Sequence, residues 1–217
     1  MGASRYHSPR RADAAAATRA SILAAGRELF LRKGYAGTTV SEIAEAARVA
    51  VPTVYSSAGG KADILAALIE PITRDPAVAE TSAAVLRSED AAEIVALLGG
   101  GVRRTLERHW DVIVELFPQS QSEPAAAEVH ERILRAYQEA VGVAAGRLAE
   151  LGALRPGLSR DDALDVLWFY LGQAAWPALV RDRGWSLERA ARWLTAQAAA
   201  ALLPSADPAR WEPDAAT

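Results

Sequence analysis

Apolar side chains recur at intervals of three and four residues along most of the chain, which is the pattern of amphipathic helices buried on one face. The first such segment spans residues 14–33, and Gly34 is placed to end it. No segment alternates apolar and polar residues as a half-buried strand would. The same pattern predicts further helices over residues 40–47, 51–57, 63–73, 88–109, 111–117, 124–151, 159–183 and 186–203. We therefore expect an all-α fold.

Capping residues and helix breakers set the expected limits of these helices. Thr39 followed three residues later by Glu42 forms a capping box in front of the second helix. Ser88 is the expected N-cap of the helix that follows it, and the glycine run at residues 99–101 is an expected break or kink inside that helix. Pro76 is expected to break the helix that precedes it.

Two of the predicted helices, residues 40–47 and 51–57, are short and are joined by a tight turn. The second is only about two turns long, which is too short to be stable alone. A short helix with small polar side chains, set on a buried partner helix, is the layout of a helix-turn-helix that reads DNA. The spacing therefore predicts a DNA-binding segment near the N-terminus.

The charge distribution separates this segment from the rest of the chain. Residues 1–61 hold nine Lys and Arg against four Asp and Glu, whereas the whole chain has a net charge of −3. A basic N-terminal quarter on an acidic body is expected when only one domain meets phosphate. The alternative is a chance clustering of solvated charges.

Other features of the composition restrict the class of protein. The chain has no Cys, so disulfides and thiolate metal sites are excluded, and we expect no metal and no cofactor. No apolar run reaches the roughly 18 residues that a membrane span needs, and the N-terminus lacks the apolar region of a signal peptide, so we expect a soluble cytoplasmic protein. An enzyme is the rival class, but the sequence lacks G-x-S-x-G, H-E-x-x-H, a P-loop and G-x-G-x-x-G. His109 and His130 are far apart in the sequence.

Between Thr18 and Leu68 the sequence contains I-L-A-A-G-R-E-L-F, K-G-Y-A-G-T-T-V, E-I-A-E-A-A, T-V-Y, and Lys61 followed by Ile64-Leu65. With these motifs the segment resembles the TetR family of bacterial transcriptional regulators. The resemblance implies a three-helix DNA-binding domain and a helical body that binds a ligand and forms a homodimer. It also implies repression of a palindromic double-stranded DNA operator, relieved by a small-molecule effector.

Four positions depart from the family pattern. Arg48 stands in the turn where the family has Gly, and a left-handed Arg there would cost roughly 1 kcal/mol. Ala50 replaces the usual Ser cap. Ser57 and Ala58 stand where the family tends to have an aromatic pair that closes the small core. None of these changes removes a phosphate contact, so the DNA-binding hypothesis is retained.

The candidate DNA-binding residues lie in and around the short helices. They are Thr38, Thr39, Arg48, Val51, Pro52, Thr53, Tyr55, Ser56 and Lys61. Tyr55 resembles the family's phosphate-binding tyrosine, and Lys61 is expected to contact phosphate because an exposed lysine there has few structural duties. The alternatives are structural: Thr39 would serve only as a cap, and Tyr55 would only pack. The N-terminal arginines Arg5, Arg10 and Arg11 could reach the minor groove or remain a solvated tail.

The predicted body offers candidates for two further sites. Ligand-binding candidates are His109, Trp110, Phe117, His130, Tyr137, Trp168 and Gln173, and their aromatic content indicates an apolar or aromatic ligand, with Arg104 or His130 available to pair an acidic group. Dimer-interface candidates are Trp168, Ala175, Leu179, Trp193, Leu194 and Gln197, because aromatic and small residues alternate in the last two helices. Packing within the monomer core is the alternative for both sets.

The expected organisation has four parts. A disordered basic tail covers residues 1–13, a helix-turn-helix DNA-binding domain 14–61, a helical ligand-binding and dimerisation domain 62–203, and a disordered tail 204–217. The rival to a DNA-binding regulator is a helical dimer that binds a partner protein or a small molecule and has lost specific DNA recognition through its altered turn.

Overall fold

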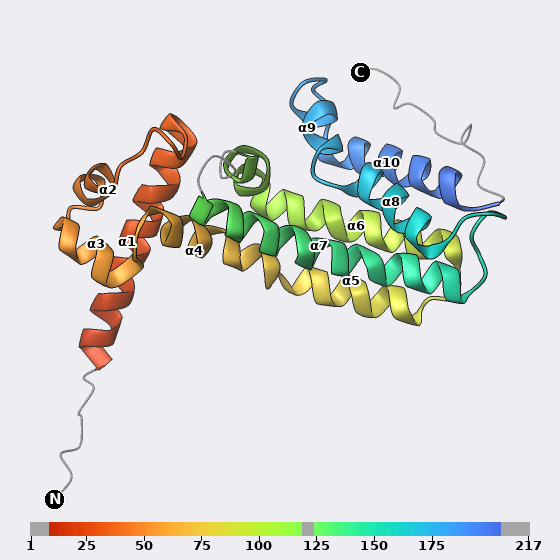
Figure 1. Ribbon diagram of the computed structural model, residues 1–217, viewed down its shortest axis with the longest axis horizontal. Coiled ribbons are helices and arrows are strands. Elements are labelled where there is room, and N and C mark those ends of the chain that lie inside the picture. The colour runs from red at the N-terminus through yellow and green to blue at the C-terminus, as the bar shows by residue number, and fades with distance from the viewer. Residues whose placement is uncertain (1–8, 119–123, 205–217) are drawn as a thin grey trace, which may run out of the picture. The chain divides into compact units, whose positions relative to one another are not determined.

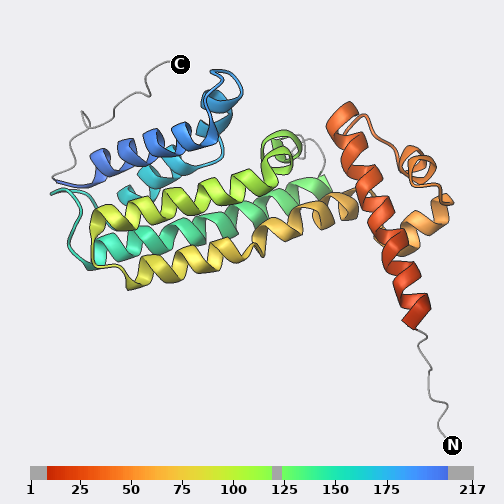
Figure 2. The ribbon, with the colours of Figure 1, turned by 180° about the vertical axis from the view of Figure 1, so that it is seen from behind.

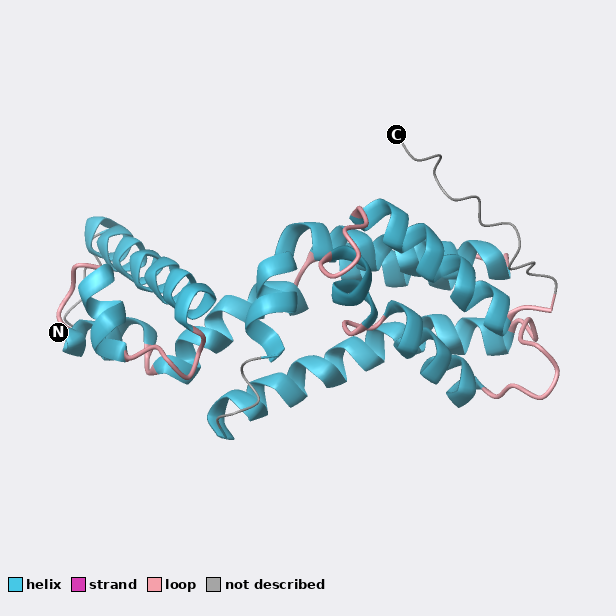
Figure 3. Ribbon diagram, turned by 90° about the horizontal axis from the view of Figure 1, so that it is seen from above, coloured by secondary structure: helices cyan, strands magenta, loops and turns pink. Residues whose placement is uncertain are grey.

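The computed structural model describes residues 9–118 and 124–204, and every regular element in these ranges is helical (Figures 1 and 3). The helices are α1 (Pro9–Lys33), α2 (Val40–Ala46), α3 (Val51–Ala58), α4 (Lys61–Thr73), α5 (Pro76–Arg87), α6 (Ala91–Trp110), a π-helical segment (Asp111–Leu116), α7 (Pro124–Glu150), α8 (Arg160–Leu171), α9 (Ala175–Val180) and α10 (Leu187–Leu202). The all-α prediction is confirmed. None of these helices has both the length and the apolar character needed to cross a membrane.

The chain forms two compact units. The first contains the residues up to Pro71 together with Glu115–Glu131, and the second contains Ile72–Val114 and the chain from Arg132 onward. The predicted boundary between the DNA-binding domain and the ligand-binding domain, at residues 61 and 62, stays a prediction. The predicted tail also stays a prediction, because the residues after Pro204 lie outside the described part of the chain.

In the first unit α1, α2 and α3 pack against one another in pairs. Their contact is a small apolar core that includes Ile22, Phe30, Ile43 and Val54, all fully buried. Gly26 on α1 allows α4 to come close, since a Cβ atom at this position would lie 2.7 Å from Cγ2 of Ile64. The apolar stripe predicted for the first helix therefore packs α1 against α2 and α3, and it also brings α1 close to Ile64 at the start of α4.

The start of α1 corrects the sequence-based prediction. The helix begins at Pro9 rather than at residue 14, so the predicted disordered tail is wrong for residues 9–13. Proline is favoured in the first turn of a helix because its φ is already helical and its missing N–H has no partner there. The Arg and Ala residues that follow are strong helix formers. Residues 1–8, including Arg5, lie outside the described residues.

In the second unit α6 is the central helix, with α5 packed on one side and α10 on another (Figures 1 and 2). The helices α8 and α9 pack on α10. The unit has one apolar core, in which Val95, Val141, Leu148, Leu167 and Ala190 are fully buried. The amphipathic patterns of the long segments thus give a helical body of the expected kind.

Three local predictions in this unit are wrong. Residues 76–87 form the helix α5, because Pro76 starts a new helix as well as following the end of α4. Ser88 is the C-cap of α5, and Asp90 is the N-cap of α6, with its carboxylate accepting from the amides of Ala92 and Glu93. The segment predicted as one helix over residues 159–183 is two helices, α8 and α9, separated at Gly172.

The glycine run at residues 99–101 does not break α6, whose one non-helical residue is His109. Instead, two of these glycines are sites of close packing. A Cβ atom at Gly99 would lie 2.0 Å from Oγ1 of Thr195 on α10, and one at Gly101 would lie 2.3 Å from Oγ1 of Thr81 on α5. The run therefore lets α5 and α10 approach the central helix.

Candidate nucleic-acid interface and ligand cavity

The second helix of the chain starts with the predicted capping box. Oγ1 of the N-cap Thr39 accepts a hydrogen bond from the Glu42 amide at 3.3 Å, and the Thr39 amide donates to Oε2 of Glu42 at 2.9 Å. The Lys33 ammonium also donates to Glu42. This bond and the two from Thr39 lower the pKa of Glu42 from 4.5 to about 2. The box is confirmed, and it fastens the start of α2 to the end of α1.

Thr38 does not have the accessible hydroxyl that the prediction requires. Its side chain is 1% exposed, and its Oγ1 donates to the Gly34 carbonyl at 2.8 Å. Its predicted contact with phosphate through the side chain is therefore wrong, because the hydroxyl is enclosed and already bonded. Thr39 is exposed, but its hydroxyl is shared with Glu42, so its capping role is the one that the structure shows.

Arg48 adopts the left-handed conformation that its position in the turn requires, with φ of 56°. Its amide donates to the Glu45 carbonyl at 3.0 Å, and the Val49 amide donates to the Ala44 carbonyl at 3.0 Å. This pair of bonds is the Schellman motif, which closes helix C-termini and favours glycine at the left-handed residue. The left-handed conformation on which the expected cost depends is confirmed, and the Arg48 side chain lies exposed at the turn.

The helix α3 is anchored by one face and leaves the other free. Val54 and Ala58 are buried, whereas Pro52, Tyr55 and Ser56 are exposed. Tyr55 has 56% of its surface exposed, so a purely packed role for this side chain is excluded in the monomer. The other two candidates on this helix, Val51 and Thr53, are half-buried. The exposed face of α3 and Arg48 together form the candidate nucleic-acid interface.

Ala50, the N-cap of α3, makes no side-chain hydrogen bond to the helix, as expected from the loss of Ser. The other end of α3 is bonded to α1, because Nη1 of Arg19 donates to the Ser57 carbonyl at 2.7 Å. A cation at a helix C-terminus is favourable, since the last carbonyls have no partner within the helix. Ala58 fills its place in the small core with 5% exposure.

Lys61 has structural contacts that sequence reasoning did not foresee. Its Nζ donates to the Tyr35 carbonyl at 2.9 Å and lies 4.4 Å from the centre of the Tyr35 ring. The premise that this lysine has few structural duties is wrong, because it fastens the start of α4 to the connection between α1 and α2. Its contact with phosphate stays a prediction.

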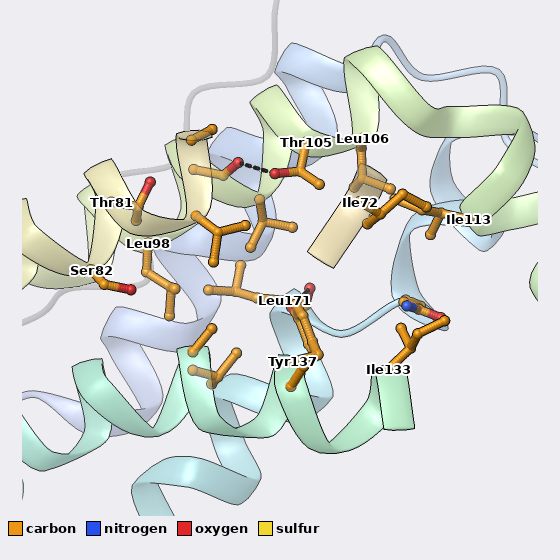
Figure 4. A pocket seen from close by; sticks show the side chains of 18 residues that line it. Ile72, Thr81, Ser82, Leu98, Thr105, Leu106, Ile113, Ile133, Tyr137 and Leu171 are labelled. Carbon is orange, nitrogen blue, oxygen red and sulfur yellow. Dashed lines mark hydrogen bonds between the residues drawn. The ribbon is translucent and has the colours of Figure 1, made fainter. Parts of the chain in front are cut away.

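The structure brings two of the seven ligand-binding candidates to one cavity. This space of about 110 Å³ lies in the second unit between α5, α6, α7 and the chain that follows α8 (Figure 4). Tyr137 and Gln173 line it. The remaining lining residues are Ile72, Ala77, Val78, Thr81, Ser82, Leu98, Gly101, Val102, Thr105, Leu106, Ile113, Ile133, Ala136, Ala140, Val141 and Leu171.

The other candidates lie outside this lining. In the first unit, Phe117 and His130 stack on each other with ring centres 4.1 Å apart. In the second unit, Trp110 packs on the core, and Trp168 packs on Tyr137 with ring centres 5.4 Å apart. His109 is also outside the lining. The predicted group of seven is thus not one site, since these aromatics serve mainly to pack helices.

His109 belongs to a polar cluster at the end of α6. Its Nε2 lies 3.0 Å from Oδ2 of Asp75, whose other oxygen accepts from Arg108 and from the Ala77 amide at α5. Burial acts to raise the pKa of Asp75, but the bonds from Ala77 and His109 and the charge of Arg108 lower it below its usual value. The cluster joins the start of α5 to the end of α6.

Most of the cavity residues could not be found from the sequence. Thr81 and Ser82 lie on α5, which the sequence did not predict as a helix, and Gly101 lies in the run that was expected to be a break. The available signal was the four-residue spacing of Ala77, Thr81 and Val85, which places these side chains on one helical face.

The predicted dimer residues are mostly half-buried: Trp168, Ala175, Leu179, Trp193 and Gln197. Leu194 is different, because it is 2% exposed and belongs to the core of the second unit, so its prediction as an interface residue is wrong. Phe169 was missed, although 72% of its surface is exposed. It lies two residues from buried Leu167, on the opposite side of α8, and that position was the signal.

Comparison with known proteins supports the assignment of the first unit. A family model described as bacterial regulatory proteins, tetR family, matches residues 22–68. No curated protein is significantly similar in sequence.

Solved structures match over nearly the whole chain. NalD, the secondary repressor of the MexAB-OprM multidrug efflux pump in Pseudomonas aeruginosa, has a TM-score of 0.70 at 23% identity, covering 87% of this chain and 96% of its own. SmeT in a complex with triclosan gives 0.67 at 20% identity, covering 91% and 100%. Bacillus subtilis FadR in complex with stearoyl-CoA gives 0.68 at 19% identity, covering 84% and 98%. These identities show the fold alone. The resemblance is confirmed: residues 22–68 match the tetR-family model, and the chain has the TetR-type fold, in which a helix-turn-helix domain is followed by a helical domain.

Proposed function

We propose that this protein is a bacterial DNA-binding transcriptional repressor that leaves its operator when a small apolar or aromatic molecule fills the cavity between α5, α6 and α7. The exposed face of α3 is the observation on which the proposal rests. Tyr55 is 56% exposed on a helix whose opposite face, Val54 and Ala58, is buried against α1 and α2. A short helix fixed in this way can enter the major groove.

The DNA contacts follow from which side chains are free. Tyr55 and Ser56 would bond to phosphate, Val51 and Thr53 would touch base edges at the start of the helix, and Arg48 would reach a phosphate or a guanine. Pro52 adds an apolar contact to the same face. Because no Arg, Asn or Gln lies on α3, specificity would depend on Arg48, on apolar contacts and on DNA shape.

A homodimer would place two such helices on the two halves of a palindromic operator. The support for a dimer is the exposed Phe169 on α8 and the half-buried Trp193 and Gln197 on α10. Aromatic side chains of this kind are enriched in the centres of interfaces. The protein would work in the cytoplasm, and we expect no enzymatic turnover of aromatic substrates.

Proteins of the same fold suggest the role of the cavity. NalD is named as a repressor of an efflux pump, one SmeT structure holds triclosan, and one FadR structure holds stearoyl-CoA. In this chain the cavity is apolar and lies in the second unit, apart from the nucleic-acid interface in sequence. A molecule bound there could act on DNA binding only by favouring one of two conformations of the protein.

A gel-shift titration of the purified protein on the DNA that flanks its gene tests the proposal. We expect a discrete complex whose affinity falls steeply with salt, because phosphate contacts release counterions. A double variant, Arg48→Ala with Tyr55→Ala, should lose at least roughly tenfold in affinity. The matched control is Leu86→Ala with Arg87→Ala on α5, which removes one exposed apolar and one exposed basic side chain in the second unit.

Equal loss in both double variants, or no loss in either, would reject the assigned DNA-binding face. Absence of any sequence-preferring complex would favour the rival function, a helical dimer that binds a partner protein or a small molecule without specific DNA recognition.

A further inference from the structure

The cavity has no charged side chain among its described lining residues. Aliphatic side chains from α5, α6 and α7 form most of its wall, with Ser82 and Leu98 at one end and Ile113 and Ile133 at the other (Figure 4). An ion that enters such a space loses its hydration and gains no counter-charge from the lining side chains, which is strongly unfavourable. The composition of the wall therefore selects against charged ligands.

Two charged side chains outside the lining, Arg104 and Asp75, are hydrogen-bonded to lining residues. Arg104 is not a lining residue, and its Nη2 donates to Oγ1 of Thr81 at 3.1 Å. The Asp75 carboxylate is occupied by Arg108, by His109 and by an amide of α5. Neither Arg104 nor Asp75 is itself a lining residue, and the pairing of Arg104 with an acidic ligand, suggested by the sequence, stays a prediction that the carboxylate probe below tests.

Hydrogen bonding within the protein satisfies three of the five polar lining side chains. Thr81 accepts from Arg104, the Thr105 hydroxyl donates to the Gly101 carbonyl at 3.2 Å, and the Tyr137 hydroxyl donates to the Leu171 carbonyl at 2.7 Å. The other two, Ser82 and Gln173, have no hydrogen-bond partner within the described part of the chain. Polar groups in partly enclosed places generally find a partner, which here would be water or a ligand.

Of these two side chains, Gln173 is the better anchor. Its amide offers two donors and an acceptor, whereas a helical Ser such as Ser82 can satisfy itself on the carbonyl of the preceding turn. Gln173 follows Gly172, the residue that caps the end of α8. A Cβ atom at Gly172 would lie 2.1 Å from the Trp168 carbonyl oxygen. Glycine at that position lets the chain leave α8 tightly and bring Gln173 to the wall.

We propose that the effector is an uncharged, mainly apolar molecule with one hydrogen-bonding group, and that the side-chain amide of Gln173 binds this group. The inference rests on the proposed function for the statement that the cavity is the effector site. The space of about 110 Å³ is of the same order as an apolar protein cavity that holds benzene. One aromatic ring with a short chain is therefore a suitable probe.

Four probes with one skeleton separate charge from hydrogen bonding: 3-phenylpropan-1-ol, 3-phenylpropanoate, 3-phenylpropylammonium and propylbenzene. Their affinities for the full-length protein are measured by calorimetric titration at neutral pH. We expect the alcohol to bind at least roughly tenfold tighter than either ion, because no charged side chain lines the cavity. We expect it to bind about fivefold tighter than propylbenzene, the usual effect of one hydrogen bond.

The variant Gln173→Leu should lower the affinity for the alcohol about fivefold, since the hydrogen bond is lost. Its affinity for propylbenzene should stay within about twofold of the wild-type value, because propylbenzene makes no such bond. Gln138→Leu, at an exposed position of α7 outside the cavity, is the matched control and should change neither affinity. Gln173→Glu should reverse part of the discrimination by binding the ammonium probe more tightly than the wild type does. If Gln173→Leu does not fold, Gln173→Met replaces it.

Three results would overturn the inference: an ion that binds as tightly as the alcohol, a Gln173→Leu variant that keeps the preference for the alcohol, or no binding of any probe at millimolar concentration. A loss in Ser82→Ala without a loss in Gln173→Leu would also overturn it, by moving the anchor to α5. Because the titration involves no DNA, failure of the gel shift with intact probe selectivity would reject the proposed function alone.

Discussion

The phenol of Tyr137 on α7 donates a hydrogen bond to the main-chain oxygen of Leu171, 2.7 Å away at the end of α8. Nε1 of Trp176 donates to the same oxygen at 3.2 Å. The Leu171 carbonyl lies at the C-terminus of a helix, where carbonyls have no partner within the helix, and these two side chains provide partners instead. Enclosure by protein raises the pKa of Tyr137, so the phenol stays protonated and remains a donor.

Replacement of Tyr137 by Phe should lower the free energy of unfolding by about 1 kcal/mol, since one hydrogen bond is lost but Trp176 still serves the carbonyl. For a chain of this size the melting temperature should fall by about 2–4 °C. Calorimetric melting measures the change. Tyr170→Phe is the matched control, because the Tyr170 hydroxyl has no hydrogen bond within the described residues and the melting temperature should not change. Equal effects in both variants would contradict the assignment.

Arg48→Gly should separate stability from DNA binding. Glycine relieves the strain of the left-handed residue at φ of 56°, so the free energy of unfolding should rise by about 1 kcal/mol. Operator affinity should fall because the exposed guanidinium is lost. Arg48→Ala should lose the same affinity without any gain in stability, since alanine keeps a Cβ atom. Thermal melting and gel shift of both variants provide the check, and a stabilised Arg48→Ala would refute the strain argument.

Two adjacent glycines of α6 should respond differently to alanine. Gly99→Ala should destabilise by about 1–3 kcal/mol, because the new Cβ atom would overlap Oγ1 of Thr195. Gly100→Ala should stabilise by up to about 1 kcal/mol, because its nearest neighbour is the end of the Arg104 side chain at 3.6 Å and alanine is the better helix former. Denaturant unfolding measures both.

Thr195→Ala should suppress the defect of Gly99→Ala, because it removes the atom that the new methyl group would meet. The double variant should regain most of the stability, with a coupling energy of about 1 kcal/mol or more. Additive effects of the two changes would show that the close contact between α6 and α10 is not the cause.

The capping box should contribute to stability in a pH-dependent way. Since the pKa of Glu42 falls from 4.5 to about 2 on folding, the folded state holds fewer protons than the unfolded state between these values. The stabilisation is thus fully present above pH 4.5 and is lost as the pH falls towards 2. Melting temperatures of Glu42→Gln and wild type should converge in this window. Glu45→Gln, on the same helix but outside the box, should run parallel to wild type.

Local signals predicted the helix-turn-helix segment well. The Thr39–Glu42 capping box, the end of α1 at Gly34 and the left-handed turn at Arg48 each involve residues within a few positions of one another. Interactions of this range are fixed by the covalent chain, so the spacing alone reveals them. The tetR-type resemblance rests on motifs in the same segment. It predicted the fold of the whole chain because the family combines such a segment with a helical body.

Only the tertiary structure showed the roles that depend on distant partners. Lys61 bonds to the Tyr35 carbonyl 26 positions earlier. Thr195, almost a hundred positions after Gly99, is the neighbour that leaves no room for a Cβ atom at Gly99. A proline can follow the end of one helix or start the next, and from the sequence we interpret Pro76 only as a break. The helix α5 and its part of the cavity were therefore not predicted. The sequence by itself determined an all-helical chain with a helix-turn-helix, because short-range hydrogen bonds and apolar periodicity fix those features. The cavity and its wall depended on which helix faces meet, and that is decided by packing among residues far apart in the chain.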